Sequence, residues 1–230
     1  MGVREAHMAP AIAFFDLDKT LIRRNSATLW VRFELAGGRM SRRQALQALS
    51  WVMRYSIAGA DMAEPIRRGA ASLAGQREAD MRERVGRFYA DLVRPLFRPG
   101  AYAAVEAHRQ AGERVVLLTS SSNYMSELVC RDLGLDAYVC NRVEVDATGC
   151  YTGRTLEPLC FGPGKVVLAE CYVRQHGTTL ADAAFYTDSH SDLPMLEAVG
   201  RPVAVHPDPR LRRLARKRGW PTVYWDRARS

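Results

Sequence analysis

The spacing of hydrophobic positions changes twice along this chain. Residues 11–15 form a short apolar run that ends at Asp16, which is typical of a buried parallel strand. From residue 26 to about residue 92 the apolar positions recur with a helical period. Ser26, Ser41 and Asp61 are suited to cap three helices in this block, and Pro65 lies near the third start. The pattern therefore predicts one strand followed by a block of helices.

A different pattern follows Pro95, Pro99 and Gly100, which mark the exit from the helical block. Short apolar runs typical of strands now alternate with segments of helical period, and a hairpin is predicted around 146–149. The predicted strands are 115–118, 142–145, 150–153, 184–187, 202–205 and 222–224, and the predicted helices are 123–133, 165–175, 208–217 and one from about 193. This alternation indicates an α/β fold, in which a parallel sheet is covered by helices on both faces. The helical block is an insertion after the first strand.

Composition is that of an ordinary globular protein, with 47% hydrophobic and 25% charged residues. No apolar run reaches the roughly 18 residues that a membrane helix needs, and the first ten residues do not resemble a signal peptide. Five cysteines, an odd number without a secretory signal, indicate reduced thiols. We therefore expect no transmembrane segment and a cytoplasmic location. The sequence leaves the oligomeric state open.

The formal net charge of +8 is concentrated in one segment. Residues 22–98 hold 15 Arg and 7 acidic residues, whereas the rest of the chain holds 18 basic and 18 acidic residues. A basic module that binds nucleic acid or a membrane surface is therefore an alternative, with the pairs at 42–43 and 67–68 or the tail 212–218 as contacts. No nucleic-acid motif or interleaving of aromatic and basic residues accompanies these arginines, so we expect no nucleic-acid partner.

Four groups of polar residues come directly after predicted strands or at helix starts. Ligands of open α/β sheets bind beyond the carboxyl ends of the strands, so these groups are candidates for one site. Paired carboxylates can attack and transfer protons, hydroxyls and N–H groups before a helix can hold an anion, and further carboxylates can bind a hard cation. The groups are Asp16 with Asp18, Thr119 with Ser120 to Ser122, Lys165 behind Gly162-Pro163-Gly164, and Asp188 with Asp192.

In this order the groups resemble the four motifs of the haloacid dehalogenase (HAD) superfamily of phosphohydrolases. The segments 15–21 (FDLDKTL) and 186–194 (YTDSHSDLP) are the most specific parts, and the resemblance extends over residues 11–224. The helical insertion resembles the cap of the phosphoserine-phosphatase-like branch. The resemblance implies a Rossmann-like parallel sheet core with a helical-bundle cap inserted after the first strand. The core would comprise 11–22 and 99–226, and the cap 23–98.

The resemblance also implies a role for each motif. Asp16 would be the nucleophile that takes the phosphoryl group, and Asp18 would protonate the leaving oxygen and then activate water. Mg²⁺ would be bound by Asp16, by the backbone carbonyl of Asp18 and by Asp188. Asp192 would orient metal-bound water or Lys165. The phosphate would be bound by Thr119, the N–H of Ser120 and Lys165.

The expected function is that of a Mg²⁺-dependent phosphatase acting on a small phosphorylated metabolite. In phosphoserine phosphatases a glutamate nine residues after the nucleophile reads the substrate amino group, and Asn25 stands at that position here. Histidinol phosphate and lysophospholipids, which relatives of this branch also hydrolyse, remain alternatives to phosphoserine. The arginines of the insertion suit either a second anionic group on the substrate or a solvated surface.

Overall fold

The computed structural model describes residues 11–58 and 62–226, with the side chains of 52–58 left aside. Its centre is a six-stranded sheet in the order β3-β2-β1-β6-β7-β8, in which all neighbouring strands are parallel. The strands are β1 (Ile12–Phe15), β2 (Arg114–Ser122), β3 (Ala137–Asn141), β6 (Ala184–Thr187), β7 (Arg201–Val205) and β8 (Thr222–Val223). The parallel sheet expected from the alternating pattern, and the Rossmann-like core that the resemblance implies, are confirmed.

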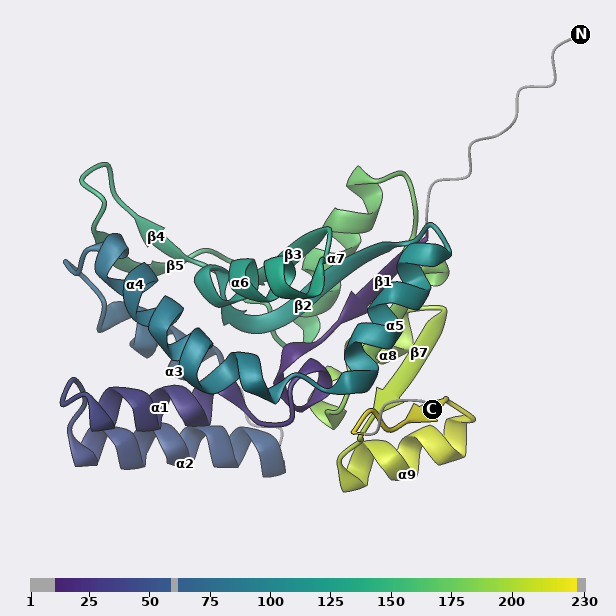
Figure 1. Ribbon diagram of the computed structural model, residues 1–230, viewed down its shortest axis with the longest axis horizontal. Coiled ribbons are helices and arrows are strands. Elements are labelled where there is room, and N and C mark those ends of the chain that lie inside the picture. Colours follow the sequence, from purple (N-terminus) through teal and green to yellow (C-terminus); the bar gives the residue numbers. More distant parts are fainter. Residues whose placement is uncertain (1–10, 59–61, 227–230) are drawn as a thin grey trace, which may run out of the picture.

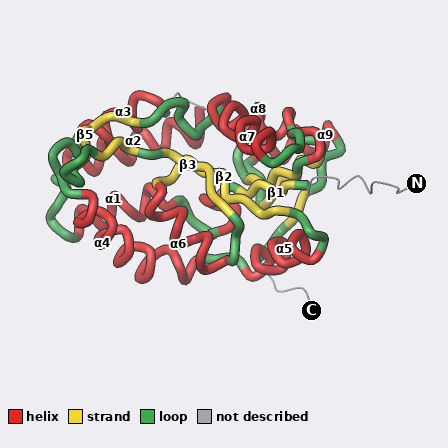
Figure 2. The backbone as a smooth tube through the Cα atoms, turned by 90° about the horizontal axis from the view of Figure 1, so that it is seen from above, coloured by secondary structure: helices red, strands yellow, loops and turns green. Residues whose placement is uncertain are grey.

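Helices cover both faces of this sheet (Figure 2). Neighbouring residues of a strand point to opposite faces, so Phe15 packs with the helices of one layer and Phe14 with those of the other. The first layer contains α5 (Pro99–Gln110) and α6 (Asn123–Leu133), and the second contains α7 (Pro163–Gln175), α8 (Leu193–Ala198) and α9 (Pro209–Arg218). Both faces of β1 are buried, which explains why its sequence is continuously apolar rather than alternating.

The insertion after β1 forms a separate group of helices at one end of the molecule (Figure 1). It contains α1 (Ser26–Ala36), α2 (Arg42–Ala58), α3 (Ala63–Ala71) and α4 (Glu78–Phe88), with α1 and α2 side by side. Trp30, Phe33 and Phe88 pack together where α1 meets α4. The antiparallel hairpin of β4 (Val143–Val145) and β5 (Tyr151–Thr155) joins this group through backbone hydrogen bonds between Tyr151 and the segment 75–76. The helical cap inserted after the first strand is thereby confirmed.

The chain enters and leaves the insertion through two adjacent segments. Ile22 and Phe97 form an antiparallel bridge, and the backbone N–H of Arg23 donates to the carbonyl of Leu96 at 3.0 Å. The entering segment follows the loop after β1, and the leaving segment leads into α5. Both connections therefore lie beside the loop that carries Asp16 and Asp18.

Several local predictions were wrong for identifiable reasons. Helix α5 was not predicted because Pro99-Gly100 was interpreted as a break, although proline is favoured in the first turn of a helix. Strand β3 was also missed, and the predicted strand 115–118 is longer than expected, because β2 continues through residues 119–122 after an irregularity in its pairing with β3. Asn25, not Ser26, caps α1, because its side chain accepts from the N–H of Thr28. Ser41 caps α2 as expected, and Asp61 lies outside the described residues.

Among the described residues, no helix combines the length and apolar character that a bilayer span requires. All five cysteines are free thiols, and Cys160 is fully buried beside the sheet.

Candidate active site

Asp16 is held at the carboxyl end of the central strand. Its backbone N–H donates to the carbonyl of Tyr186 on β6 at 2.9 Å, so it continues the sheet by one residue. The chain then turns tightly, with Lys19 at φ 58° and the N–H of Ile22 donating to the carbonyl of Leu17 at 3.1 Å. This turn brings the side chains of Asp16 and Asp18 to the same cavity.

Asp18 lies against the start of α1. Its Oδ1 accepts a hydrogen bond of 2.7 Å from the backbone N–H of Ser26, the first residue of that helix. Burial raises the pKa of Asp18 above its usual range, and the Ser26 hydrogen bond offsets part of this effect. A carboxyl group with a raised pKa is better suited to donating a proton than an ordinary aspartate.

Lys165 connects two carboxylates that come from different strands. Its Nζ lies 2.8 Å from Oδ1 of Asp16 and 2.9 Å from Oδ1 of Asp192, and its side chain is only 2% exposed. Burial raises the pKa of Asp16 to about 7, although the Lys165 ammonium acts in the opposite direction. A buried cation with two carboxylate partners is fixed in position, so its charge is directed at whatever binds next to Asp16.

Two aspartates follow β6, and each is oriented by a threonine. The Thr187 hydroxyl donates to Oδ2 of Asp192 at 2.7 Å, and the backbone N–H of Asp188 donates to the Thr20 hydroxyl at 3.0 Å. Asp188 is 6% exposed, and burial together with the neighbouring charge of Asp16 raises its pKa well above the usual value. Asp188 is therefore anchored to the loop of Asp16 through its own backbone.

Thr119 and Ser120 lie where β2 passes its last regular pair. Thr119 is buried, and its hydroxyl accepts from the N–H of Ser121 at 3.2 Å. The Ser120 hydroxyl donates to the carbonyl of Cys160 at 2.8 Å, while Asn141 bonds both the carbonyl of Ser120 and the N–H of Cys160. These contacts hold the phosphate-binding candidate on β2 against the segment that leads to Lys165.

One cavity of about 90 Å³ brings all eight predicted residues together. The predicted residues on its wall are Asp16, Asp18, Asn25, Thr119, Ser120, Lys165, Asp188 and Asp192. Lys19, Ser189 and Asp208 also line it and were not predicted as site residues. Asp208 follows the predicted strand 202–205, so the rule that selected Asp16 and Asp188 would also have selected it. Lys19 carried no such signal, because its place in the cavity depends on its positive φ.

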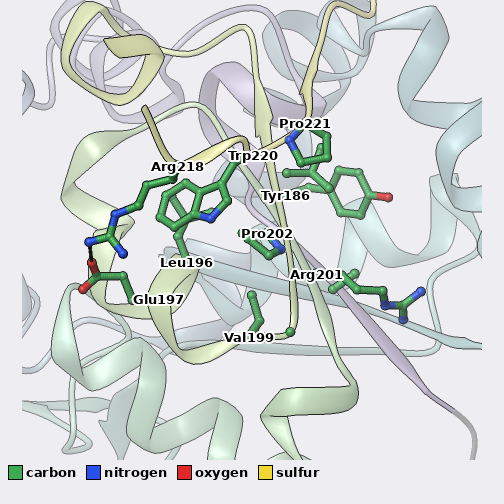
Figure 3. Close-up of a pocket in the computed structure, with 12 residues that line it drawn as sticks. Tyr186, Leu196, Glu197, Val199, Arg201, Pro202, Arg218, Trp220 and Pro221 are labelled. Carbon is green, nitrogen blue, oxygen red and sulfur yellow. Dashed lines mark hydrogen bonds and ion pairs between the residues drawn. The ribbon is translucent and has the colours of Figure 1, made fainter. Parts of the chain in front are cut away.

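A larger hollow of about 680 Å³ lies at the opposite ends of the strands (Figure 3). It is lined by residues at the amino ends of β6 and β7 together with Trp220 and Pro221. Its two arginines are occupied, since Arg218 pairs with Glu197 at 2.9 Å and Arg201 pairs with Glu113 at 2.8 Å. We therefore assign the chemistry to the smaller cavity at the carboxyl ends.

The donor set of the small cavity fits a hard cation. Asp16, Asp188 and the carbonyl of Asp18 offer oxygen ligands, which Mg²⁺ prefers. The buried carboxylates of Asp16 and Asp188 repel one another, and a bound cation would relieve that repulsion. Within 11–58 and 62–226 no three His, Cys, Asp or Glu side chains form a complete metal cage.

Gly164 fixes the position of Lys165, and replacing it by alanine tests this. A Cβ at Gly164 would lie 2.0 Å from the carbonyl oxygen of Leu159, a backbone atom that cannot turn aside. We expect Gly164→Ala to lower the free energy of unfolding by about 3 kcal/mol and kcat by about tenfold, because Lys165 would move away from Asp16. Chemical denaturation and steady-state kinetics measure the two effects.

Gly86→Ala is the matched control, since a Cβ at this position in α4 meets nothing within 4 Å. It should leave kcat unchanged and stabilise the fold by up to about 1 kcal/mol. Unchanged kcat in folded Gly164→Ala would show that the start of α7 does not set the position of Lys165.

Comparison with known sequences places the chain among hydrolases. The sequence model of the haloacid dehalogenase-like hydrolases matches residues 13–197. The "Inhibition of morphological differentiation protein" of Streptomyces azureus is 34% identical over 98% of this chain and 82% of its own length. A probable phosphatase of Mycobacterium tuberculosis is 33% identical over 96% of this chain and 78% of its own. A histidinol-phosphatase of Neisseria meningitidis is 28% identical over 92% of this chain and 97% of its own.

Solved structures with a similar fold are known. A protein of unknown function from Bordetella pertussis is 29% identical, with a TM-score of 0.84 over 94% of this chain and 99% of that one. A phospho-aspartyl intermediate analogue of phosphoserine phosphatase is 18% identical, with a TM-score of 0.70 over 96% of this chain and 95% of that one. At that identity the second likeness concerns the fold alone.

Proposed function

This chain belongs to the haloacid dehalogenase-like hydrolases and is a phosphatase of that family, and we propose that it hydrolyses small organic phosphomonoesters through an aspartyl-phosphate on Asp16. The observation that carries the proposal is the contact of Asp16 with buried Lys165 in a cavity that Asp18 also lines. A carboxylate nucleophile, a fixed cation and a second carboxylic acid are the groups that phosphoryl transfer to an aspartate requires.

In the first step a carboxylate oxygen of Asp16 attacks phosphorus. The new bond from Asp16 to phosphorus forms as the ester bond to the leaving oxygen breaks. Lys165, at 2.8 Å from Asp16, lowers the repulsion between the anionic nucleophile and the phosphate. Thr119 and the N–H of Ser120 are assigned to hold the other phosphoryl oxygens.

Asp18 serves both steps as the proton carrier. Its carboxylic acid protonates the leaving oxygen, and the resulting carboxylate then takes a proton from the water that attacks the aspartyl-phosphate. Phosphate leaves, Asp16 is regenerated as a carboxylate, and Asp18 is again protonated. Burial, which raises the pKa of Asp18, favours its protonated form at the start of the cycle.

Mg²⁺ is the proposed cofactor, held by Asp16, Asp188 and the backbone carbonyl of Asp18. When bound, it neutralises charge shared between the nucleophile and the substrate phosphate. Asp192 orients Lys165, and Thr187 in turn orients Asp192.

The cap side of the cavity bears on the choice of substrate. Asn25 lines it, but Oδ1 of Asn25 already accepts from the N–H and the hydroxyl of Thr28 at 3.0 and 3.2 Å. Only its amide N–H groups remain to be donated, and these offer no partner to an ammonium group, which phosphoserine and histidinol phosphate both carry. Histidinol phosphate and lysophospholipids are the alternatives, and the first is the substrate class named for the relative from Neisseria meningitidis.

The arginine excess of the cap does not extend to this cavity. No arginine is among the described residues that line it. Many cap arginines instead pair with acids, and two of these pairs reach across to Glu127 and Glu157. These pairs favour a solvated and structural role for the arginines.

The proposed cap comprises residues 23–98, and the proposed core comprises residues 11–22 and 99–226. The free thiols suit a reducing compartment such as the cytoplasm.

Phosphate release from a panel of metabolites tests the function. We expect turnover of phosphomonoesters with Mg²⁺, and a kcat/KM for phosphoserine at least about tenfold below that of the best substrate, since an interaction worth 1.4 kcal/mol corresponds to tenfold. The panel should include phosphoserine, histidinol phosphate and lysophosphatidate. Acid quenching during turnover should also trap a phosphoenzyme that hydroxylamine cleaves, as expected for an acyl phosphate. Turnover without such an intermediate would argue for direct attack by water.

A further inference from the structure

Arg98 is a buried cation that neither the motifs nor the mechanism above uses. It lies at the exit from the cap, directly before α5, and is 6% exposed. Its Nη2 donates to the backbone carbonyl of Lys19 at 3.1 Å, and its Nη1 forms an ion pair with Asp226. One side chain thus joins the loop after β1 to the segment that follows β8.

The carbonyl that Arg98 holds belongs to the most constrained residue of the active-site loop. Lys19 follows Asp18 directly and has φ 58°, a conformation that costs a non-glycine residue roughly 1 kcal/mol or more. Such a residue persists only where its surroundings fix it. Arg98 also donates its backbone N–H to the carbonyl of Leu21 at 2.9 Å, so it binds the loop through both its side chain and its backbone.

Asp226 is itself fixed against the core. The backbone carbonyl of its neighbour Trp225 accepts a hydrogen bond of 3.0 Å from the N–H of Gly100. The backbone N–H of Trp225 donates to Nε2 of His206 at 2.7 Å. A Cβ on Gly100 would lie 2.6 Å from the Trp225 side chain, which shows how closely the segment packs on the start of α5. The backbone of the counter-ion is therefore held against α5 and β7, and its half-exposed carboxylate also lies near Arg23 and His206.

We propose that Arg98, with Asp226 as its counter-ion, is a positioning residue for the acid–base step. The inference rests on the proposed function, in which Asp18 protonates the leaving oxygen. The side chain of Asp18 is held by the N–H of Ser26 at 2.7 Å, and the carbonyl of the next residue, Lys19, is held by Arg98 at 3.1 Å. Without the guanidinium, the Lys19 peptide is released and the carboxyl of Asp18 is no longer directed at the leaving oxygen.

The test is the dependence of kcat/KM on the leaving group in Arg98→Lys and Arg98→Met. This constant reports the steps up to transfer of the phosphoryl group to Asp16, and 4-nitrophenolate leaves without a proton whereas an alkoxide needs one. We expect both variants to lose about tenfold or more in kcat/KM for an alkyl phosphate and less than about threefold for 4-nitrophenyl phosphate. Asp226→Asn should show the same selectivity to a smaller extent.

A partly unfolded preparation would lose the same factor on both substrates, so the ratio between them separates positioning from stability. Arg94→Met is the matched control, because Arg94 lies in the same connection but is exposed and pairs with Asp132. It should retain the wild-type ratio. An unchanged ratio in folded Arg98→Lys and Arg98→Met would overturn the proposal.

Asp18→Asn, measured in parallel, distinguishes this inference from the proposed function. If Asp18→Asn shows the leaving-group selectivity and the Arg98 variants do not, only the role of Arg98 is wrong. If Asp18→Asn itself hydrolyses alkyl phosphates at the wild-type rate, the proposed acid–base role fails.

Discussion

Asp16→Asn is expected to lower kcat by about 10³-fold or more on every phosphomonoester, because loss of a covalent nucleophile removes the whole reaction path. An amide nitrogen and a carbonyl oxygen cannot replace a carboxylate that must attack phosphorus and carry the phosphoryl group. Steady-state turnover of 4-nitrophenyl phosphate measures the loss, and the hydroxylamine-sensitive phosphoenzyme should disappear with it.

The fold of this variant should survive. Asparagine has nearly the same shape, and Lys165 keeps Asp192 as a partner at 2.9 Å. The pKa of Asp16 is raised to about 7 in the folded protein. The free energy of unfolding therefore falls as the pH rises from the usual pKa of an aspartate to about 7, and above that pH the ionised carboxyl destabilises the fold by a constant amount. Removing that charge should therefore not lower Tm at pH 8. A folded Asp16→Asn protein that retains wild-type turnover would exclude the aspartyl-phosphate mechanism.

Asp16 and Asp188 were found from sequence for a reason that does not depend on family resemblance. Parallel strands end at one edge of their sheet, so polar residues that follow them meet in space however far apart they are in the chain. The hydrogen bond of 2.8 Å between Lys165 and Asp16 joins residues 149 positions apart. The same reasoning failed for α5, where Pro99 begins a helix instead of ending one.

Other features depended on packing that a pattern of residue types does not contain. Arg98 was indistinguishable from the other arginines of the insertion until its guanidinium was placed between Lys19 and Asp226. Asn25 was interpreted as a specificity residue from its position after the nucleophile, and its capping of α1 became visible only in three dimensions. Burial and partner choice, rather than residue type, decide what such side chains do.

Removal of Mg²⁺ is expected to reduce turnover by about 10²-fold or more, since charge neutralisation at the transferring phosphate contributes several kcal/mol. Treatment with EDTA followed by dialysis, and then titration with Mg²⁺, measures the loss and its recovery. Asp188→Asn should raise the Mg²⁺ concentration needed for half-maximal activity, because it removes one of the two proposed carboxylate ligands.

A readout that does not involve turnover accompanies this prediction. Burial raises the pKa values of Asp16, Asp18 and Asp188, and the charge of Asp16 adds to the effect at Asp188. Crowding of these carboxylates therefore destabilises the folded protein at neutral pH when no metal ion is bound. Mg²⁺ at about 100 times its Kd would stabilise the fold by about 2.7 kcal/mol, which corresponds to a rise of about 5–10 °C in Tm for a chain of this size. Asp188→Asn should reduce that rise, whereas Arg94→Met should preserve it. Full activity after exhaustive EDTA treatment, together with a Tm that Mg²⁺ does not change, would show that these carboxylates act without a metal ion.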